Sequence, residues 1–144
     1  MEHAKMTLSV DPLKRARQTV YEAFVRTGKA PPSGEVTADD LRALAAARVV
    51  VLYPDGETIR FAAPFANGET AFRVTSGGRT WFAPCAWDAF AIPAALHGDA
   101  AIEARCAQTG LALDCGVREG RPYGKAVVHM LVPAARFWEN IVYT

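Results

Sequence analysis

The residues of this sequence that could do chemistry are concentrated around Cys85. Cys85 directly follows Pro84, and Asp88 comes three residues later, where the pattern changes from strand to helix. Residues three apart share one face of a helical turn, so the thiol and the carboxyl group are expected within reach of one small ligand. The open N–H groups and the positive dipole end at a helix start are expected to lower the pKa of the Cys85 thiol. The pair would join a soft nucleophile to a proton carrier.

Apolar side chains surround this pair in the sequence. Trp81, Phe82, Trp87 and Phe90 are expected to bury the carboxyl group. Burial raises the pKa of a carboxyl group, which would let Asp88 donate a proton near neutral pH. Residue types alone leave an ordinary alternative open, in which the cysteine is a small core residue and the aspartate interacts with the helix dipole.

The other cysteines and the histidines do not form a recognisable metal site. The three cysteines, an odd number, are irregularly spaced and are expected to be free thiols in a reducing compartment. They form no CxxC pair, and the histidines are scattered, so a structural zinc site is not expected. His97 and Asp99 follow the site helix and are expected in a surface loop.

Residues 1–62 are predicted to form a small helical module with a wing-like hairpin. Asp11 and Pro12 start a helix with one apolar stripe, and Gly28 ends that helix. A second helix begins at Thr37, capped in the manner of a capping box. Strands at residues 49–53 and 58–62 flank an Asp-Gly turn, which predicts a hairpin. The order helix, helix, hairpin indicates a trimmed winged-helix-like module.

Residues 63–144 are predicted to form a second domain, a mixed β-sheet with a short helix that carries the site. Turn residues separate runs of apolar and β-branched residues, and Pro93 is expected to break or bend the site helix. The predicted elements are strands at 70–75, 80–83, 101–106 and 111–117, the site helix at 84–96, a polar turn at 118–124, a buried strand at 125–132 and a last helix at 133–139. The fold class predicted for the whole chain is therefore α+β.

Charge and hydropathy exclude several classes of partner. The formal net charge is +1, which provides no electrostatic footprint for nucleic acid or an anionic membrane. A DNA-binding regulator is the least favoured function, because the second helix would present Asp39 and Asp40 to phosphates. No apolar run is long enough to span a bilayer and the N-terminus has no signal-peptide pattern, so a cytoplasmic location is expected.

The segment FRVTSGGRTWFAPCAWDAFAIPAALHGDAAIEARCAQTG, residues 72–110, resembles the central region of organomercurial (alkylmercury) lyases. The similarity rests on a Cys-x-x-Asp pair followed by an Ile-Pro-Ala element, and it extends weakly to the Ala-Pro-Phe run at 63–65. It implies protonolysis of a carbon–mercury bond without an organic cofactor. By this resemblance Cys85 is the nucleophile and primary mercury ligand, Asp88 is the proton carrier, and Cys106 is structural.

The sequence also departs from the family pattern. Relatives use a second active-site cysteine directly after a stretch like Ile141-Val142-Tyr143-Thr144, and the sequence stops at Thr144. We therefore expect that thiol to be missing by truncation, and the N-terminal module to be short by about one helix. Two alternatives follow: an impaired member that binds mercurials through Cys85 with Asp88, or an active one in which Cys115 provides the second thiol. Strand alternation favours a core position for Cys115.

The expected substrate is a small alkyl- or arylmercury compound, with external thiols needed for release and a thiol carrier or reductase receiving the mercuric ion. The chain is expected to be a monomer or homodimer that binds neither nucleic acid nor membrane. The main rival function is non-catalytic binding of a soft metal by Cys85 with Asp88 or another thiol.

Overall fold

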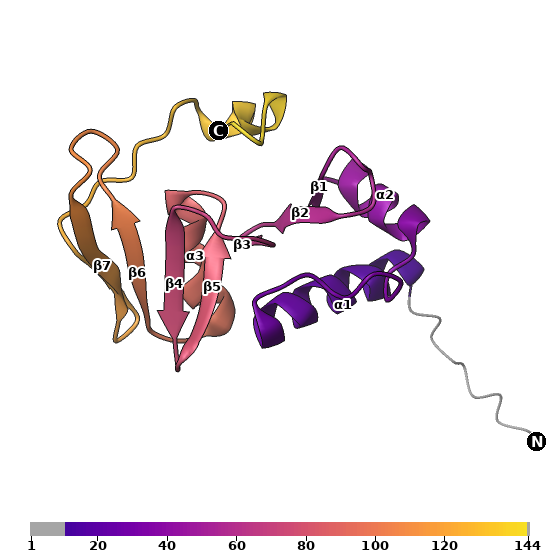
Figure 1. Cartoon of the computed structure of the whole chain (residues 1–144), viewed down its shortest axis with the longest axis horizontal. Coiled ribbons are helices and arrows are strands. Elements are labelled where there is room, and N and C mark those ends of the chain that lie inside the picture. Colours follow the sequence, from indigo (N-terminus) through magenta and orange to yellow (C-terminus); the bar gives the residue numbers. More distant parts are fainter. Residues whose placement is uncertain (1–10, 144) are drawn as a thin grey trace, which may run out of the picture.

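The computed structural model describes residues 11–143, and its helices and strands are shown in Figure 1. The helices are α1 (Pro12–Thr27), α2 (Ala38–Ala46), α3 (Ala86–Leu96) and the 3-10 helix η1 (Ala134–Glu139). The strands are β1 (Val51–Leu52), β2 (Ile59–Ala62), β3 (Phe65–Ala66), β4 (Phe72–Ser76), β5 (Arg79–Ala83), β6 (Ala100–Arg105), β7 (Ala112–Arg118) and β8 (Arg121–Tyr123).

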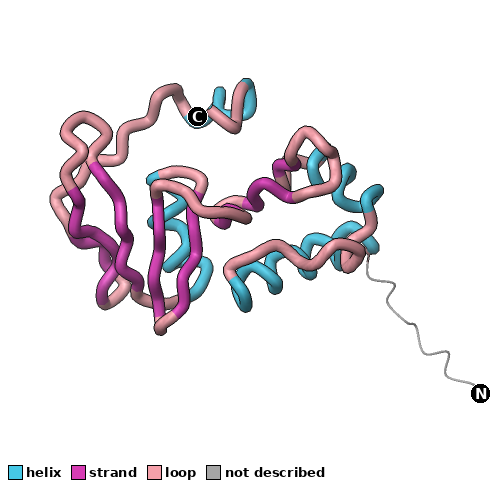
Figure 2. Tube along the Cα trace, in the orientation of Figure 1, coloured by secondary structure: helices cyan, strands magenta, loops and turns pink. Residues whose placement is uncertain are grey.

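The strands form one sheet in the order β1-β2-β3-β5-β4-β6-β7-β8. Each neighbouring pair is antiparallel, so the α+β class is confirmed but the prediction of a mixed sheet is wrong. Short turns join most consecutive strands, and such turns can connect only antiparallel neighbours. The connection through α3 does not create a parallel pair, because β6 pairs with β4 instead of β5. Figure 2 shows α3 behind the strands of this part of the sheet.

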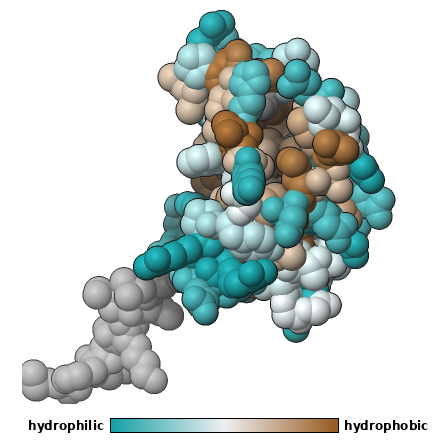
Figure 3. Space-filling model, turned by 90° about the vertical axis from the view of Figure 1, so that its left-hand side faces the viewer, coloured by the Kyte–Doolittle hydropathy of each residue, from teal (hydrophilic) through white to brown (hydrophobic). Residues whose placement is uncertain are grey.

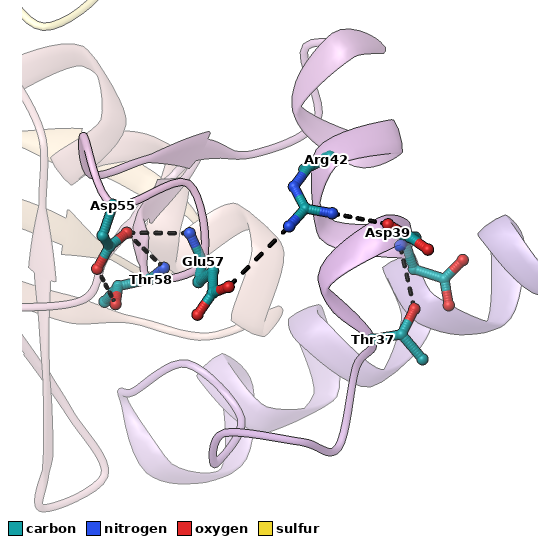
Figure 4. A network of polar contacts seen from close by, with 7 residues as sticks. Thr37, Asp39, Arg42, Asp55, Glu57 and Thr58 are labelled. Carbon is teal, nitrogen blue, oxygen red and sulfur yellow. Dashed lines mark hydrogen bonds and ion pairs between the residues drawn. The ribbon is translucent and has the colours of Figure 1, made fainter.

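The predicted caps of the first two helices are present. The Asp11 side chain accepts a hydrogen bond from the Leu13 N–H at 3.0 Å, and the Thr37 hydroxyl accepts one from the Asp40 N–H at 3.1 Å. Figure 4 shows the second cap together with the β1–β2 turn, where the Asp55 carboxylate accepts hydrogen bonds from Glu57 and Thr58. The predicted hairpin therefore forms, although its strands are shorter than expected.

Helix α1 is held against the centre of the sheet. The Trp81 indole N–H donates to the Phe24 carbonyl at 2.8 Å, and the Phe24 ring stacks on Phe65 at 5.6 Å. At the end of α1, Gly28 adopts a φ of 72°, and a Cβ there would lie 2.7 Å from the Thr80 carbonyl oxygen. Buried residues on both sides of position 62 form one core cluster. The domain boundary at 62 and the winged-helix likeness stay predictions.

The C-terminal residues do not extend the sheet, so the prediction of a buried strand at 125–132 is wrong. The predicted polar turn contains β8, which pairs with β7. The chain then leaves the sheet as an exposed segment in which Val127 is 90% exposed. Apolar composition indicated burial, but no strand of the described residues lies beyond β8 to pair with this segment. Figure 3 shows hydrophobic side chains at the surface in the upper half of this end of the molecule. The predicted last helix is present as the 3-10 helix η1.

Within residues 11–143, none of the helices combines the length and the apolar character that crossing a membrane requires.

Candidate active site

The junction between β5 and α3 brings Cys85 and Asp88 together. Cys85 is the N-cap of α3, with extended φ and ψ of −147° and 175°, and its carbonyl accepts the Ala89 N–H at 3.0 Å. The Cys85 thiol donates to Asp88 Oδ2 at 3.4 Å. Helix α3 continues through Pro93 to Leu96, so the predicted break at Pro93 is absent and the first turn belongs to an intact helix.

Burial changes the acidity of both groups in the same direction. The pKa of Asp88 is raised, chiefly because burial disfavours its charged form, as the sequence predicted. The pKa of Cys85 is also raised, first by burial and then by the negative charge of Asp88 and its acceptance of the thiol hydrogen bond. The prediction of a lowered Cys85 pKa is therefore wrong. N–H groups of Trp87 and Asp88 do favour the thiolate, but burial outweighs them.

Both side chains line a cavity of about 610 Å³ at the meeting point of three parts of the chain. One wall comes from the segment around β1 and β2, a second from the β3–β4 connection and the start of α3, and a third from the C-terminal segment. The lining residues are Arg48, Val49, Val51, Tyr53, Arg60, Phe61, Ala63, Ala66, Gly68, Glu69, Thr70, Phe72, Pro84, Cys85, Ala86, Trp87, Asp88, His129, Leu131, Phe137, Trp138, Ile141, Val142 and Tyr143.

The aromatic surroundings differ from those predicted. Of the four aromatic residues expected around the pair, Trp87 lines the cavity and is 59% exposed. Trp81 is buried in the core, and Phe90 lines a separate cavity at the C-terminal half of α3. The apolar wall comes instead from residues distant in sequence, such as Phe61 and Leu131. These positions carry no local motif, and only the folding of the chain assembles them.

Helix α1 makes a hydrogen bond to the cavity lining, which the sequence did not predict. The Tyr21 hydroxyl donates to the carbonyl of Ala63, a cavity-lining residue, at 3.0 Å. The pKa of Tyr21 is raised mainly by burial, with Arg17 lowering it and the negative charge of Asp88 raising it further. The only sequence signal was its place beside the apolar stripe of α1.

The remaining cysteines lie outside the cavity. Cys115 is buried in β7, and its thiol donates to the Ile102 carbonyl at 3.7 Å. Its surroundings are the core that strand alternation indicated, and it is not among the cavity-lining residues. Cys106 lies in the β6–β7 turn, where hydrogen bonds from the Thr109 side chain and from the backbone of Thr109 and Gln108 lower its pKa. The thiol with the lowered pKa is thus not the one in the cavity.

His97 and Asp99 lie in the connection between α3 and β6, as predicted. His97 ends the helix in a left-handed conformation with φ of 53°. The Asp99 carboxylate accepts the N–H groups of Glu119 and Gly120 at 2.7 and 3.2 Å, which holds the β7–β8 turn and lowers the pKa of Asp99. Neither residue lines the cavity of Cys85.

The described residues contain no group of three or more histidines, cysteines and acids that could enclose a metal ion. The cavity instead offers one sulfur atom and one carboxyl group at hydrogen-bonding distance. Such a pair can bind a single soft atom through sulfur and move one proton between sulfur and oxygen.

Comparison with known proteins identifies a family and a similar solved structure. A family model described as MerB, alkylmercury lyase, matches residues 65–144, which is more than half of the chain. A solved structure described as the mercury-bound form of MerB2 is similar to the fold, with a TM-score of 0.59 and 25% sequence identity. The similarity covers 78% of this chain and 60% of that chain, so the chain spans under two thirds of that protein's length. No curated protein matches. On the family match, this chain belongs to the alkylmercury lyase family.

Proposed function

We propose that the chain captures organomercurials at Cys85 and cleaves their carbon–mercury bond by protonolysis, with Asp88 as the proton carrier. The observation that carries this proposal is the 3.4 Å contact between the Cys85 sulfur and Asp88 Oδ2 inside a cavity. Membership of the alkylmercury lyase family supports it.

Capture begins from a neutral thiol, since burial and Asp88 both raise the pKa of Cys85. Mercury is a soft ion that prefers sulfur ligands, and a thiol that coordinates a metal ion loses its proton. The thiol proton passes to the Asp88 carboxylate, which already accepts the hydrogen bond. The Cys85 sulfur then forms a bond to mercury, and the previous ligand of the mercurial, a halide or thiolate, leaves as an anion.

Cleavage returns the proton. The raised pKa of Asp88 lets its carboxyl group hold the proton and then donate it to the carbon bound to mercury. The carbon–mercury bond breaks, its electron pair forms the new carbon–hydrogen bond, and the hydrocarbon leaves. Mercury stays on Cys85 as a cation and takes back an anionic ligand. One mercurial and one thiol thereby yield one hydrocarbon and one mercuric dithiolate or halide adduct, with no redox change.

Product release in this scheme needs thiols from outside the chain. Among the described residues, Cys85 is the one cysteine that lines the cavity, so the second sulfur on mercury would come from a small thiol or a carrier protein. The scheme uses no organic cofactor. A thiol carrier or a reductase would then receive the mercuric ion.

A rival function is non-catalytic binding of mercurials or other soft metal ions. The observation in its favour is that same solitary thiol, because a single sulfur can hold a mercurial without cleaving it. Cys115 gives no support to a second ligand, since it is buried against Ile102.

The experiment that tests the proposal offers phenylmercury with excess 2-mercaptoethanol and measures benzene in the headspace. Peptide mass spectrometry in parallel locates the adduct. Benzene release that disappears in Cys85→Ser supports the lyase. An adduct at Cys85 without benzene supports the binding protein, and an unchanged adduct yield in Cys85→Ser contradicts both.

A further inference from the structure

The cavity of Cys85 carries two guanidinium groups that neither the thiol chemistry nor the core requires. Arg48 follows α2 and Arg60 lies in β2, and both line the cavity. Each guanidinium lies over an aromatic ring of the same cavity. The Arg60 guanidinium carbon is 5.4 Å from the centre of the Tyr53 ring, and that of Arg48 is 5.5 Å from the centre of the Trp138 ring.

A guanidinium that lies over an aromatic ring is attracted by the electrons of the ring face. This attraction is not a hydrogen bond to a protein acceptor, so it does not occupy the N–H donors in the way a carboxylate partner would. Within residues 11–143, neither arginine makes a salt bridge to a carboxylate, and neither donates a side-chain hydrogen bond to a protein acceptor. Two cations without a carboxylate partner among these residues therefore line the cavity in which a mercurial would bind.

The charges of the other titratable groups in the cavity set what these cations can bind. Glu69 is exposed on the β3–β4 connection, and Asp88 is engaged with the Cys85 thiol. Asp88 therefore already has a partner, and Glu69 is the other carboxyl group among the residues that line the cavity. Arg48 and Arg60 thus bring two positive charges to the cavity, and neither is paired with Glu69 or Asp88.

We infer that Arg48 and Arg60 recognise a carboxylate carried by the mercurial. This inference rests on the proposed capture at Cys85 and names the substrate class more narrowly, as organomercurials bearing an acidic group. A guanidinium edge matches the two oxygens of a carboxylate and binds it through two parallel hydrogen bonds. The carboxylate can belong to the organic group bound to mercury or to the thiol that mercury brings with it.

The test is a competition between two mercurials that differ by a carboxylate. Equimolar phenylmercury and 4-(hydroxymercuri)benzoate compete for limiting protein, and peptide mass spectrometry measures the ratio of the two adducts at Cys85. The native chain should favour the benzoate. Arg60→Gln and Arg48→Gln should each reduce this preference about threefold to fivefold, the size of an exposed ion pair, and added salt should reduce it too.

Arg79→Gln is the matched control, because it removes one positive charge from the β4–β5 turn, away from the cavity. It should leave the ratio unchanged, which separates recognition from general attraction. Arg60→Lys should retain part of the preference, since it keeps the charge and loses the planar group. Because the readout is a ratio, a general loss of reactivity cancels.

A second arm locates the carboxylate. Phenylmercury is offered in separate reactions as its complex with 3-mercaptopropionate or with 2-mercaptoethanol, and the ratio of the two rates of adduct formation at Cys85 is measured. A faster reaction of the former complex that Arg60→Gln removes assigns the carboxylate to the departing thiol. Equal ratios in the native chain and both glutamine variants, in both arms, would overturn the inference while Cys85 adducts persist. Absence of any adduct at Cys85 would instead contradict the proposed function.

Discussion

Replacement of Asp88 by asparagine should separate capture of the mercurial from cleavage of its carbon–mercury bond. Asparagine keeps the size of the side chain and an oxygen that can accept the thiol hydrogen bond now made at 3.4 Å. It cannot take up or deliver a proton. Loss of a positioned general acid typically costs a factor of about 10² to 10⁴, equivalent to about 3–5 kcal/mol of barrier. Hydrocarbon release should fall by that factor.

Capture should behave differently in the same variant. The negative charge of Asp88 and its hydrogen bond both raise the pKa of Cys85, so their removal or weakening lowers that pKa. The thiolate fraction at a given pH below the pKa rises about tenfold for each pKa unit lost. The Cys85 adduct should therefore form at least as fast in Asp88→Asn as in the native chain, while benzene release collapses.

Stability provides a third readout for Asp88→Asn. The pKa of Asp88 is raised in the folded chain, so the folded state binds more protons than the unfolded state between the two pKa values. The contribution of this group is fully present below the unfolded pKa and is lost as the pH rises through the folded pKa. Removal of the carboxylate should consequently leave the chain equally or more stable at neutral pH, measured as the urea midpoint.

Three parallel measurements decide the matter: headspace benzene, the rate of adduct formation at Cys85, and the urea midpoint. Asp114→Asn is the control, because Asp114 is an exposed acid on β7 outside the cavity. Benzene release at the native rate in Asp88→Asn would refute the role of Asp88 as proton carrier. A parallel loss of the adduct would show instead that Asp88 holds the metal or the local structure.

Three further predictions concern thiol acidity and packing. Iodoacetamide at about pH 8 should label Cys106 before Cys85, because hydrogen bonds lower the pKa of Cys106 whereas burial raises that of Cys85. Peptide mass spectrometry measures the order of labelling, and the reverse order would contradict the prediction. Phe24→Ala should cost about 3–5 kcal/mol in urea unfolding, against less than about 1 kcal/mol for Val25→Ala, since Phe24 is fully buried and Val25 is 39% exposed. Gly28→Ala should cost more than about 1 kcal/mol, because φ is 72° and the new Cβ would meet the β5 backbone; an unchanged urea midpoint would show that this contact can relax.

Much of the fold could be predicted because its signals are local. Asp11, Pro12 and Gly28 bound α1 through capping and a left-handed end, which depend only on neighbouring residues. The Asp55-Gly56 pair likewise predicted the β1–β2 hairpin from two neighbouring residues. The apolar run at 125–132 led to the wrong prediction of a buried strand. Composition indicates a preference for burial, but it does not show whether a partner strand is present, and β8 already pairs with the edge of β7.

The sequence by itself predicted that Cys85 and Asp88 lie together, because Cys85 is the N-cap of α3 and Asp88 is in its first turn. Tertiary structure decided how that pair behaves. Burial, which depends on residues distant in sequence, outweighs the helix N–H groups and raises the pKa of the thiol. Arg48, Arg60 and Trp138 likewise reach the cavity only when the chain folds. The contact between Arg48 and Trp138 joins residues far apart in the sequence, so no local pattern could predict it. Long-range packing therefore sets the acidity and surroundings of the site that a short motif supplies.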